Sequence, residues 1–185
     1  RIFFKMFFVI ILCVVVYSQP NDYSFDHKKI KVSSKQKKYE INISYPQIST
    51  FAGNPRISSY YGFNSLVRKN METERDSFIV WMKDWDINEY NRDFSSEYDI
   101  GDSVFYADEN LISLHFYAYS YFAGAAHPNN WSFSINYDLD NSKELHLSDI
   151  LTSGWENKIS EICIKEITLQ KEKTEIQPDE WLKDG

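Results

Sequence analysis

Glycine, proline and cysteine are all scarce in this sequence of 185 residues, which contains 6, 5 and 2 of them respectively. The few glycines form no phosphate-binding pattern, which excludes a nucleotide site built from a glycine-rich loop. Two cysteines cannot form a disulfide framework. Basic residues are also outnumbered, because 20 lysines and arginines face 27 acidic residues and leave a net charge of −7. We therefore expect no nucleic-acid partner, since such a partner requires a basic footprint.

The longest hydrophobic run lies at the N-terminus and is too short for an ordinary membrane span. Arg1 and Lys5 precede the apolar run Met6–Tyr17, and the small or polar residues Ser18–Pro20 follow it. This order of positive, apolar and small residues is typical of a secretory signal peptide. We expect residues 1–18 to be that signal peptide, with an uncleaved signal anchor as the alternative. The protein would then be exported, as a periplasmic, secreted or cell-envelope protein, and membrane-bound only if the segment stays uncleaved.

Two further segments flank the expected domain. Lysines crowd the region before residue 39, and such charge runs predict a flexible basic linker at 19–38. The C-terminal pattern has no evident stop, so we expect 171–185 to begin a further C-terminal part. Cys163 has apolar neighbours at helical spacing, which predicts a buried thiol.

Aromatic residues are abundant, at 17% of the chain, and many of them follow the periodicity of strands. Apolar residues occupy alternate positions in Leu111–Phe122 and again in Trp131–Leu139. Such alternation predicts two half-buried strands, and the small residues between them predict the loop of a long hairpin. Further strands are expected at 95–107 and at 143–147.

The remaining regular segments complete the expected fold. Alternation in Tyr39–Tyr45 predicts a first strand, closed by Pro46. Apolar residues at three- and four-residue steps predict an amphipathic helix at about 58–83, and Asn64 on its apolar stripe would need a hydrogen-bond partner. A second helical pattern runs through Trp155–Leu169. We therefore predict an α+β fold, an antiparallel β-meander with two helices packed on one face, preceded by the signal peptide.

Several motifs in and around the hairpin resemble a family of extracytoplasmic bacterial domains. They are Asn110–Leu114, Tyr119–His127 (YSYFAGAAH), Asn136–Leu139, Lys143–Leu145, Leu147–Leu151 and Tyr45-Pro46. The family occurs in the outer part of the anti-sigma factor RsiV and in the N-terminal region of the peptidoglycan deacetylase PdaC. The resemblance spans residues 39–170, with an extra Ala126 and with Ser142 in place of a turn glycine.

This resemblance implies an exported domain near the cell wall that binds an extracellular protein, such as a lysozyme-like one, or a peptidoglycan-type glycan. The metal-binding motifs of a polysaccharide-deacetylase domain do not occur in the sequence, so the resemblance implies no deacetylase activity. The domain is therefore expected to be non-catalytic.

The candidate binding residues lie on the polar side of the expected hairpin. Tyr117, Tyr119 and Tyr121 are in phase along one strand. They would either pack beneath a helix or form an aromatic platform for a glycan or a protein. His127 closes the loop of small residues and would either hydrogen-bond the loop backbone or contact a ligand. We take these four residues as the candidate binding site.

No catalytic, metal or cofactor site is predicted. The histidines and carboxylates match no standard metal-ligand spacing, and no serine lies in a nucleophile motif. The alternative to a binding domain is an enzyme module that processes cell-wall glycans. It would use Asp138, Asp149 and His127 as acid, base or ligands, and it requires these three side chains to converge. A purely structural module of a larger chain is the third possibility.

Overall fold

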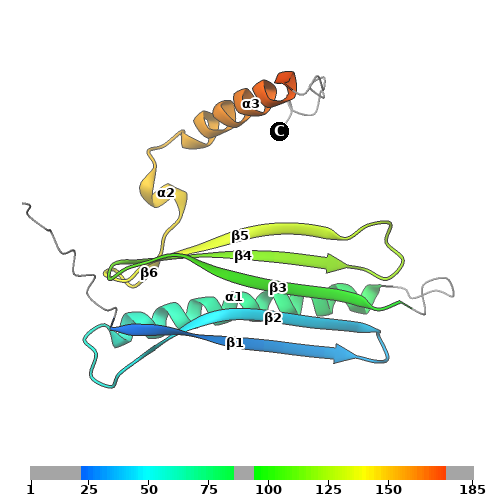
Figure 1. The fold of residues 1–185 in the computed structure, drawn as a ribbon, viewed down its shortest axis with the longest axis horizontal. Coiled ribbons are helices and arrows are strands. Elements are labelled where there is room, and N and C mark those ends of the chain that lie inside the picture. The colour runs from blue at the N-terminus through cyan, green and yellow to red at the C-terminus, as the bar shows by residue number, and fades with distance from the viewer. Residues whose placement is uncertain (1–21, 86–93, 174–185) are drawn as a thin grey trace, which may run out of the picture.

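A computed structural model describes residues 22–85 and 94–173 and contains one curled sheet of six strands in the order β1-β2-β3-β4-β5-β6. The strands are β1 (Tyr23–Ser34), β2 (Tyr39–Thr50), β3 (Ser96–Ala107), β4 (Leu111–Tyr121), β5 (Asn129–Asp138) and β6 (Lys143–Glu144). The helices are α1 (Ile57–Asp84), α2 (Leu147–Ile150) and α3 (Trp155–Lys173) (Figure 1). The predicted α+β class and the β4–β5 hairpin are confirmed. The predicted signal peptide lies outside the described residues.

The sheet is mixed, so the prediction of a wholly antiparallel meander is wrong. Strands β1 and β2 form one antiparallel hairpin, and β3 to β6 form an antiparallel run. The two units meet at a parallel seam in which Tyr39–Ile43 of β2 pairs with Ser96–Ile100 of β3. The reason is α1, which separates these strands in the sequence and crosses back over the sheet, so that β3 starts beside the start of β2.

The prediction of a flexible linker at 19–38 is also wrong for the residues that the structure describes. Strand β1 pairs with β2 along its whole length, from Tyr23 opposite Thr50 to Ser34 opposite Tyr39. Its aromatic and aliphatic residues pack against the core, while its lysines remain exposed. Lysines suit an edge strand because they discourage pairing with another sheet. The domain therefore includes residues that precede position 39.

Helix α1 covers one face of the sheet and forms the core with it. Phe63, Val67, Met71 and Phe78 of this helix are fully buried, and they face buried side chains from strands β2 to β5. The apolar stripe predicted from the sequence is confirmed in part, because Val67, Met71 and Phe78 pack while Tyr61 and Trp81 are exposed. Phe63 was not part of the predicted stripe.

Gly62 leaves room on α1 for the side chain of Tyr137 from β5. A Cβ atom at this position would collide with the phenol oxygen of Tyr137, a side chain that is itself buried. We expect Gly62→Ala to lower the free energy of unfolding by about 2 kcal/mol, although alanine favours helix, because overpacking costs more than the propensity gains. Urea denaturation measures the change, and a variant as stable as the parent protein would contradict it.

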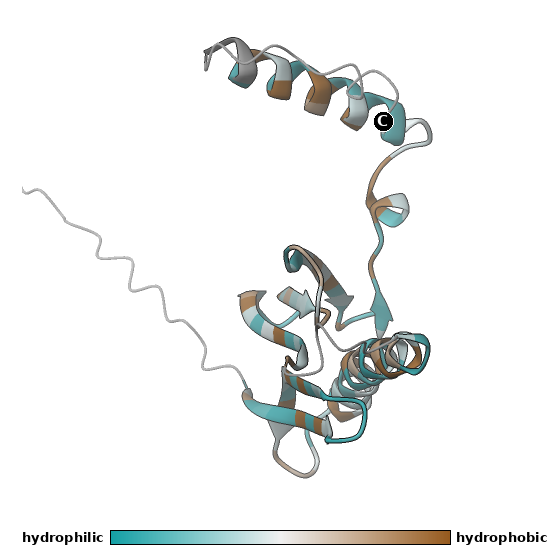
Figure 2. Cartoon of the chain, turned by 90° about the vertical axis from the view of Figure 1, so that its right-hand side faces the viewer, coloured by the Kyte–Doolittle hydropathy of each residue, from teal (hydrophilic) through white to brown (hydrophobic). Residues whose placement is uncertain are grey.

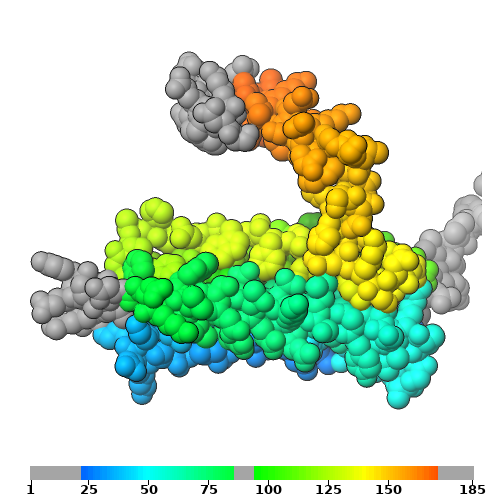
Figure 3. Space-filling model, turned by 180° about the vertical axis from the view of Figure 1, so that it is seen from behind, coloured from blue at the N-terminus to red at the C-terminus, as the bar shows by residue number. Residues whose placement is uncertain are grey.

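Helix α3 does not pack on the sheet, so the prediction of two helices on one face is wrong. It stands clear of the sheet and of α1 (Figures 1, 2 and 3). Its apolar side chains are exposed, with Ile162 at 59%, and Cys163 is exposed instead of buried. The reason is that α1 already occupies that face of the sheet. The chain leaves the sheet after β6, and Gly154, with φ of 84°, lies in the turn between α2 and α3 (Figure 1). Within the described residues, no helix is long and apolar enough to cross a membrane.

Candidate functional site

The side chains of β1 to β5 that point away from α1 form a surface that we call the outer face. On β4 the even-numbered residues, such as Leu114 and Phe116, are buried beneath α1. The odd-numbered residues therefore point to the opposite side, because strand side chains alternate. Tyr117 is 55% exposed, and Tyr119 and Tyr121 are partly exposed on the same side. Of the two alternatives for the three tyrosines, packing beneath the helix is wrong, and their role in binding stays a prediction.

Further aromatic side chains extend the tyrosine row. The ring of His115 lies 4.5 Å from that of Tyr117 in an edge-on arrangement, and its Nδ1 atom lies 3.1 Å from Ser134 Oγ. Phe105, which is 75% exposed, has its ring 6.2 Å from that of His115. Phe105 was not among the candidate binding residues predicted from the sequence. A register shift between Val104 and Tyr106 leaves it outside the strand pairing, and no sequence pattern signals that shift.

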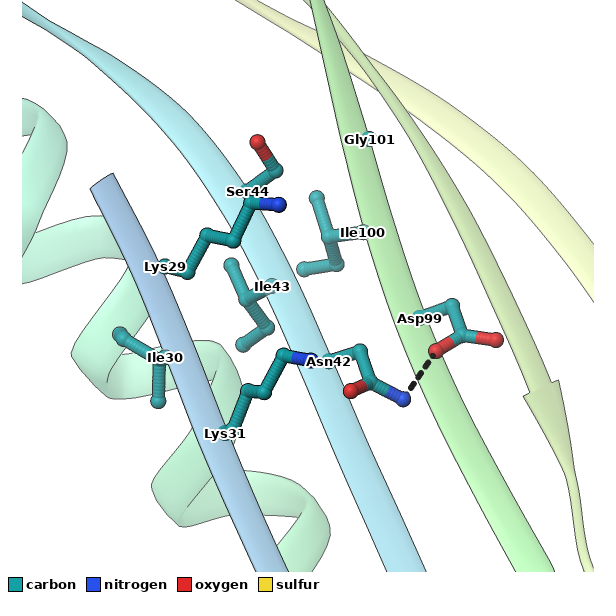
Figure 4. A pocket seen from close by; sticks show the side chains of 9 residues that line it. All are labelled: Lys29, Ile30, Lys31, Asn42, Ile43, Ser44, Asp99, Ile100 and Gly101. Atoms are coloured by element: carbon teal, nitrogen blue, oxygen red, sulfur yellow. Dashed lines mark hydrogen bonds between the residues drawn. The ribbon is translucent and has the colours of Figure 1, made fainter. Parts of the chain in front are cut away.

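A groove of about 440 Å³ lies on the outer face over the parallel seam. The residues that line it are Lys29 and Lys31 from β1, Asn42 and Ser44 from β2, and Asp99 and Gly101 from β3, with three isoleucines of the same strands (Figure 4). The Nδ2 atom of Asn42 donates a hydrogen bond of 3.1 Å to Asp99 Oδ1. Figure 4 shows both lysine side chains extending from β1 toward β2.

The groove and the tyrosines adjoin each other. Asn42 is opposite both Lys31 and Asp99, and Asp99 is opposite Tyr119 on β4. Gly101 is opposite Tyr117, and a Cβ atom at Gly101 would meet nothing within 4 Å. The outer face therefore continues without interruption from two amines to a row of phenol rings.

His127 lies in the loop beyond the end of β4, and it is exposed. Its Nδ1 atom lies 3.1 Å from the carbonyl oxygen of Pro128, which agrees with the loop-fixing alternative. In the described part of the chain, no contact joins His127 to the three tyrosines. A ligand contact at His127 stays a prediction.

The three residues of the enzyme alternative do not converge. Asp138 ends β5 and accepts hydrogen bonds of 2.8 and 2.7 Å from the backbone and side chain of Asn141, which lower the pKa of its carboxyl. Asp149 accepts from the backbone N–H of His146 at 2.8 Å and from Lys143 at 3.0 Å, and these contacts lower its pKa likewise. His127 lies before the other end of β5, which is 10 residues long and so spans about 30 Å.

The carboxylates of the enzyme alternative therefore fix local turns, and that hypothesis is wrong for these residues. Across residues 22–85 and 94–173, no three His, Cys, Asp or Glu side chains come close enough to hold a metal ion.

Comparison with solved structures places the fold among known ones. A DUF3298-family protein of Bacteroides fragilis superposes with a TM-score of 0.53 at 17% identity, covering 89% of this chain and 75% of that one. A DUF3298-family protein of Pseudomonas aeruginosa has a TM-score of 0.50 at 16% identity, covering 84% and 70%. At such identities the likeness concerns the fold alone. No curated protein matches the chain.

A protein-family comparison gives the closer relationship. The family model described as Deacetylase PdaC matches residues 32–130, from β1 to the start of β5. This range contains the three tyrosines, His127 and four of the six polar or glycine positions of the groove. It also confirms the resemblance noted in the sequence. Since the match covers more than half of the 185 residues, the chain belongs to the Deacetylase PdaC family.

Proposed function

We propose that this protein is a non-catalytic glycan-binding domain of the cell envelope and that its outer face is the binding surface. The observation that supports this function is the unbroken row of exposed aromatic, amide, hydroxyl and charged side chains on neighbouring strands. A sugar ring has an apolar C–H face, which packs on aromatic rings, and hydroxyl groups, which exchange hydrogen bonds with polar side chains. The outer face offers partners for both.

The strands hold these side chains in fixed positions. Tyr117 and Asp99 belong to the middle of the sheet, and each is paired with residues of the strands on both sides. A site built on paired strands is more rigid than one built on loops, so less conformational entropy is lost on binding. The expected export signal at residues 1–18 and the membership in a family named for a deacetylase support a cell-wall setting for this ligand.

Replacing Tyr117 is the direct test of this function. We expect the parent protein to be retained on insoluble peptidoglycan and Tyr117→Ala to bind at least about tenfold more weakly, because exposed aromatic anchors carry much of the affinity of such surfaces. Sedimentation of the purified protein with peptidoglycan at increasing concentrations measures the affinity.

Tyr61→Ala is the matched control, since Tyr61 is a tyrosine that is 65% exposed but lies on α1, away from the outer face. Equal binding by Tyr117→Ala and the parent protein would contradict the proposed surface.

A lysozyme-type protein is the other expected ligand class. Retention of the parent protein on immobilised lysozyme but not on peptidoglycan would show that the ligand is a protein and would contradict the glycan.

A further inference from the structure

We infer that the glycan bound by the outer face is acidic and that Lys29 and Lys31 bind a carboxylate on it. This inference rests on the proposed function, because it specifies the ligand class for the same surface. It concerns the groove over the parallel seam, whose lysines lie on β1 just before the first residue of the family match.

The charge of the groove is the first argument. In the described part of the chain, the side chains of Lys29 and Lys31 take part in no ion pair or hydrogen bond. The carboxylate that lines the groove, Asp99, already accepts a hydrogen bond from Asn42. The groove therefore has two ammonium groups and one carboxylate, which leaves a local positive charge on a protein with a net charge of −7. Such a site attracts an anion and repels the cations that the rest of the surface attracts.

The spacing of the two lysines is the second argument. They are two positions apart on one strand and point to the same side, so their Cα atoms lie about 6.6 Å apart. Lysine side chains are long and flexible, so the ammonium groups of two lysines with this Cα separation can both reach the oxygens of one carboxylate. Both side chains extend over β2 in Figure 4, toward Ser44 and Asn42.

The path from the groove to the tyrosines is the third argument. Lys31 is opposite Asn42 on β2, Asn42 is opposite Asp99 on β3, and Asp99 is opposite Tyr119 on β4. Four neighbouring strands therefore connect an amine to a phenol ring through the hydrogen-bonded pair of Asn42 and Asp99. Strands β1 and β4 are three inter-strand spacings apart, about 14 Å. A glycan that contacts both Lys31 and Tyr119 spans that distance, which requires an oligosaccharide with its acidic group at the lysine end.

The test compares two glycans of similar length by isothermal titration calorimetry with the full chain. One is chitotetraose, which is neutral, and the other is a tetrasaccharide of peptidoglycan with the carboxylates of its muramic acid residues. We expect the parent protein to bind the acidic glycan about tenfold more tightly, because charge-assisted hydrogen bonds to the carboxylate add to the ring contacts. The double variant Lys29→Gln/Lys31→Gln should bind both glycans equally, at the strength of the neutral one.

Two comparisons separate this inference from the proposed function. Lys28→Gln/Lys35→Gln removes the same charge from the same region but outside the groove, so it should keep the preference for the acidic glycan. Tyr117→Ala should weaken the binding of both glycans. Equal affinities of the parent protein for the two glycans, with tyrosine dependence retained, would overturn the acidic ligand and leave the glycan surface standing. Failure to bind either glycan would overturn both.

Discussion

Phe78→Ala is expected to lower the free energy of unfolding by about 4 kcal/mol, the cost of removing a phenylalanine ring from a packed core. Phe78 is fully buried near the C-terminal end of α1. Its ring stacks on that of Tyr98 at 4.9 Å and lies 5.4 Å from Phe122 and 6.1 Å from Tyr39. Its removal would leave a cavity between α1 and strands β2 and β3, on both sides of the parallel seam. Chemical denaturation followed by circular dichroism measures the loss.

Phe105→Ala is the matched control for this prediction. Phe105 is the same residue type, but it is 75% exposed, so its replacement should change the free energy of unfolding by less than about 0.5 kcal/mol. A loss below about 2 kcal/mol for Phe78→Ala would contradict the packing described for α1.

Asn64→Leu is expected to lower the free energy of unfolding by about 3 kcal/mol. Strand β2 pairs with β3 only as far as Ile43, so the backbone of Ile48 has no strand beside it on that side. The side chain of Asn64 on α1 supplies the hydrogen-bond partners that a neighbouring strand would otherwise supply. Its Oδ1 accepts from the N–H of Ile48 at 2.7 Å, and its Nδ2 donates to the carbonyl of Ile48 at 2.9 Å. Leucine would leave both backbone groups unsatisfied in a buried residue, and each such group costs about 1–3 kcal/mol.

Asn70→Leu is the comparison for this second prediction. Asn70 also lies on α1, but its side chain donates to the carbonyl of Leu66, one turn earlier in the same helix. That carbonyl keeps its helical partner without Asn70, so the loss should stay below about 1 kcal/mol. Equal losses for the two asparagines, measured by urea denaturation, would show that the link between α1 and β2 contributes nothing.

The sequence was informative wherever the pattern is local. Alternation along 111–122 and 131–139 predicted the hairpin, and the apolar stripe of α1 predicted both its packing face and the need of Asn64 for a partner. Strand β1 was not predicted, because the lysines among its aromatic and aliphatic residues indicated a basic linker instead. Helix α3 shows the converse, since its apolar residues at helical spacing predicted a packed helix but remain exposed.

The candidate site also has one part that the sequence predicted and one part that it did not. One strand contributes Tyr117, Tyr119 and Tyr121, so their common face could be predicted from spacing alone. The groove takes Lys31, Asn42 and Asp99 from three strands, and two of those strands pair across a helix of 28 residues. No local pattern states which strands become neighbours, so the lysines could not be joined to the tyrosines before the structure was known.

The parallel seam would also make the proposed ligand binding depend on the integrity of the fold. The amines of the outer face belong to the unit that precedes α1, and the phenol rings belong to the unit that follows it. Asn42 and Asp99, which meet at the seam, are 57 positions apart in the sequence. A fragment that contains either unit alone thus has half of the surface. A glycan that spans the seam is bound only by the assembled domain, and by mass action it draws the equilibrium toward that state.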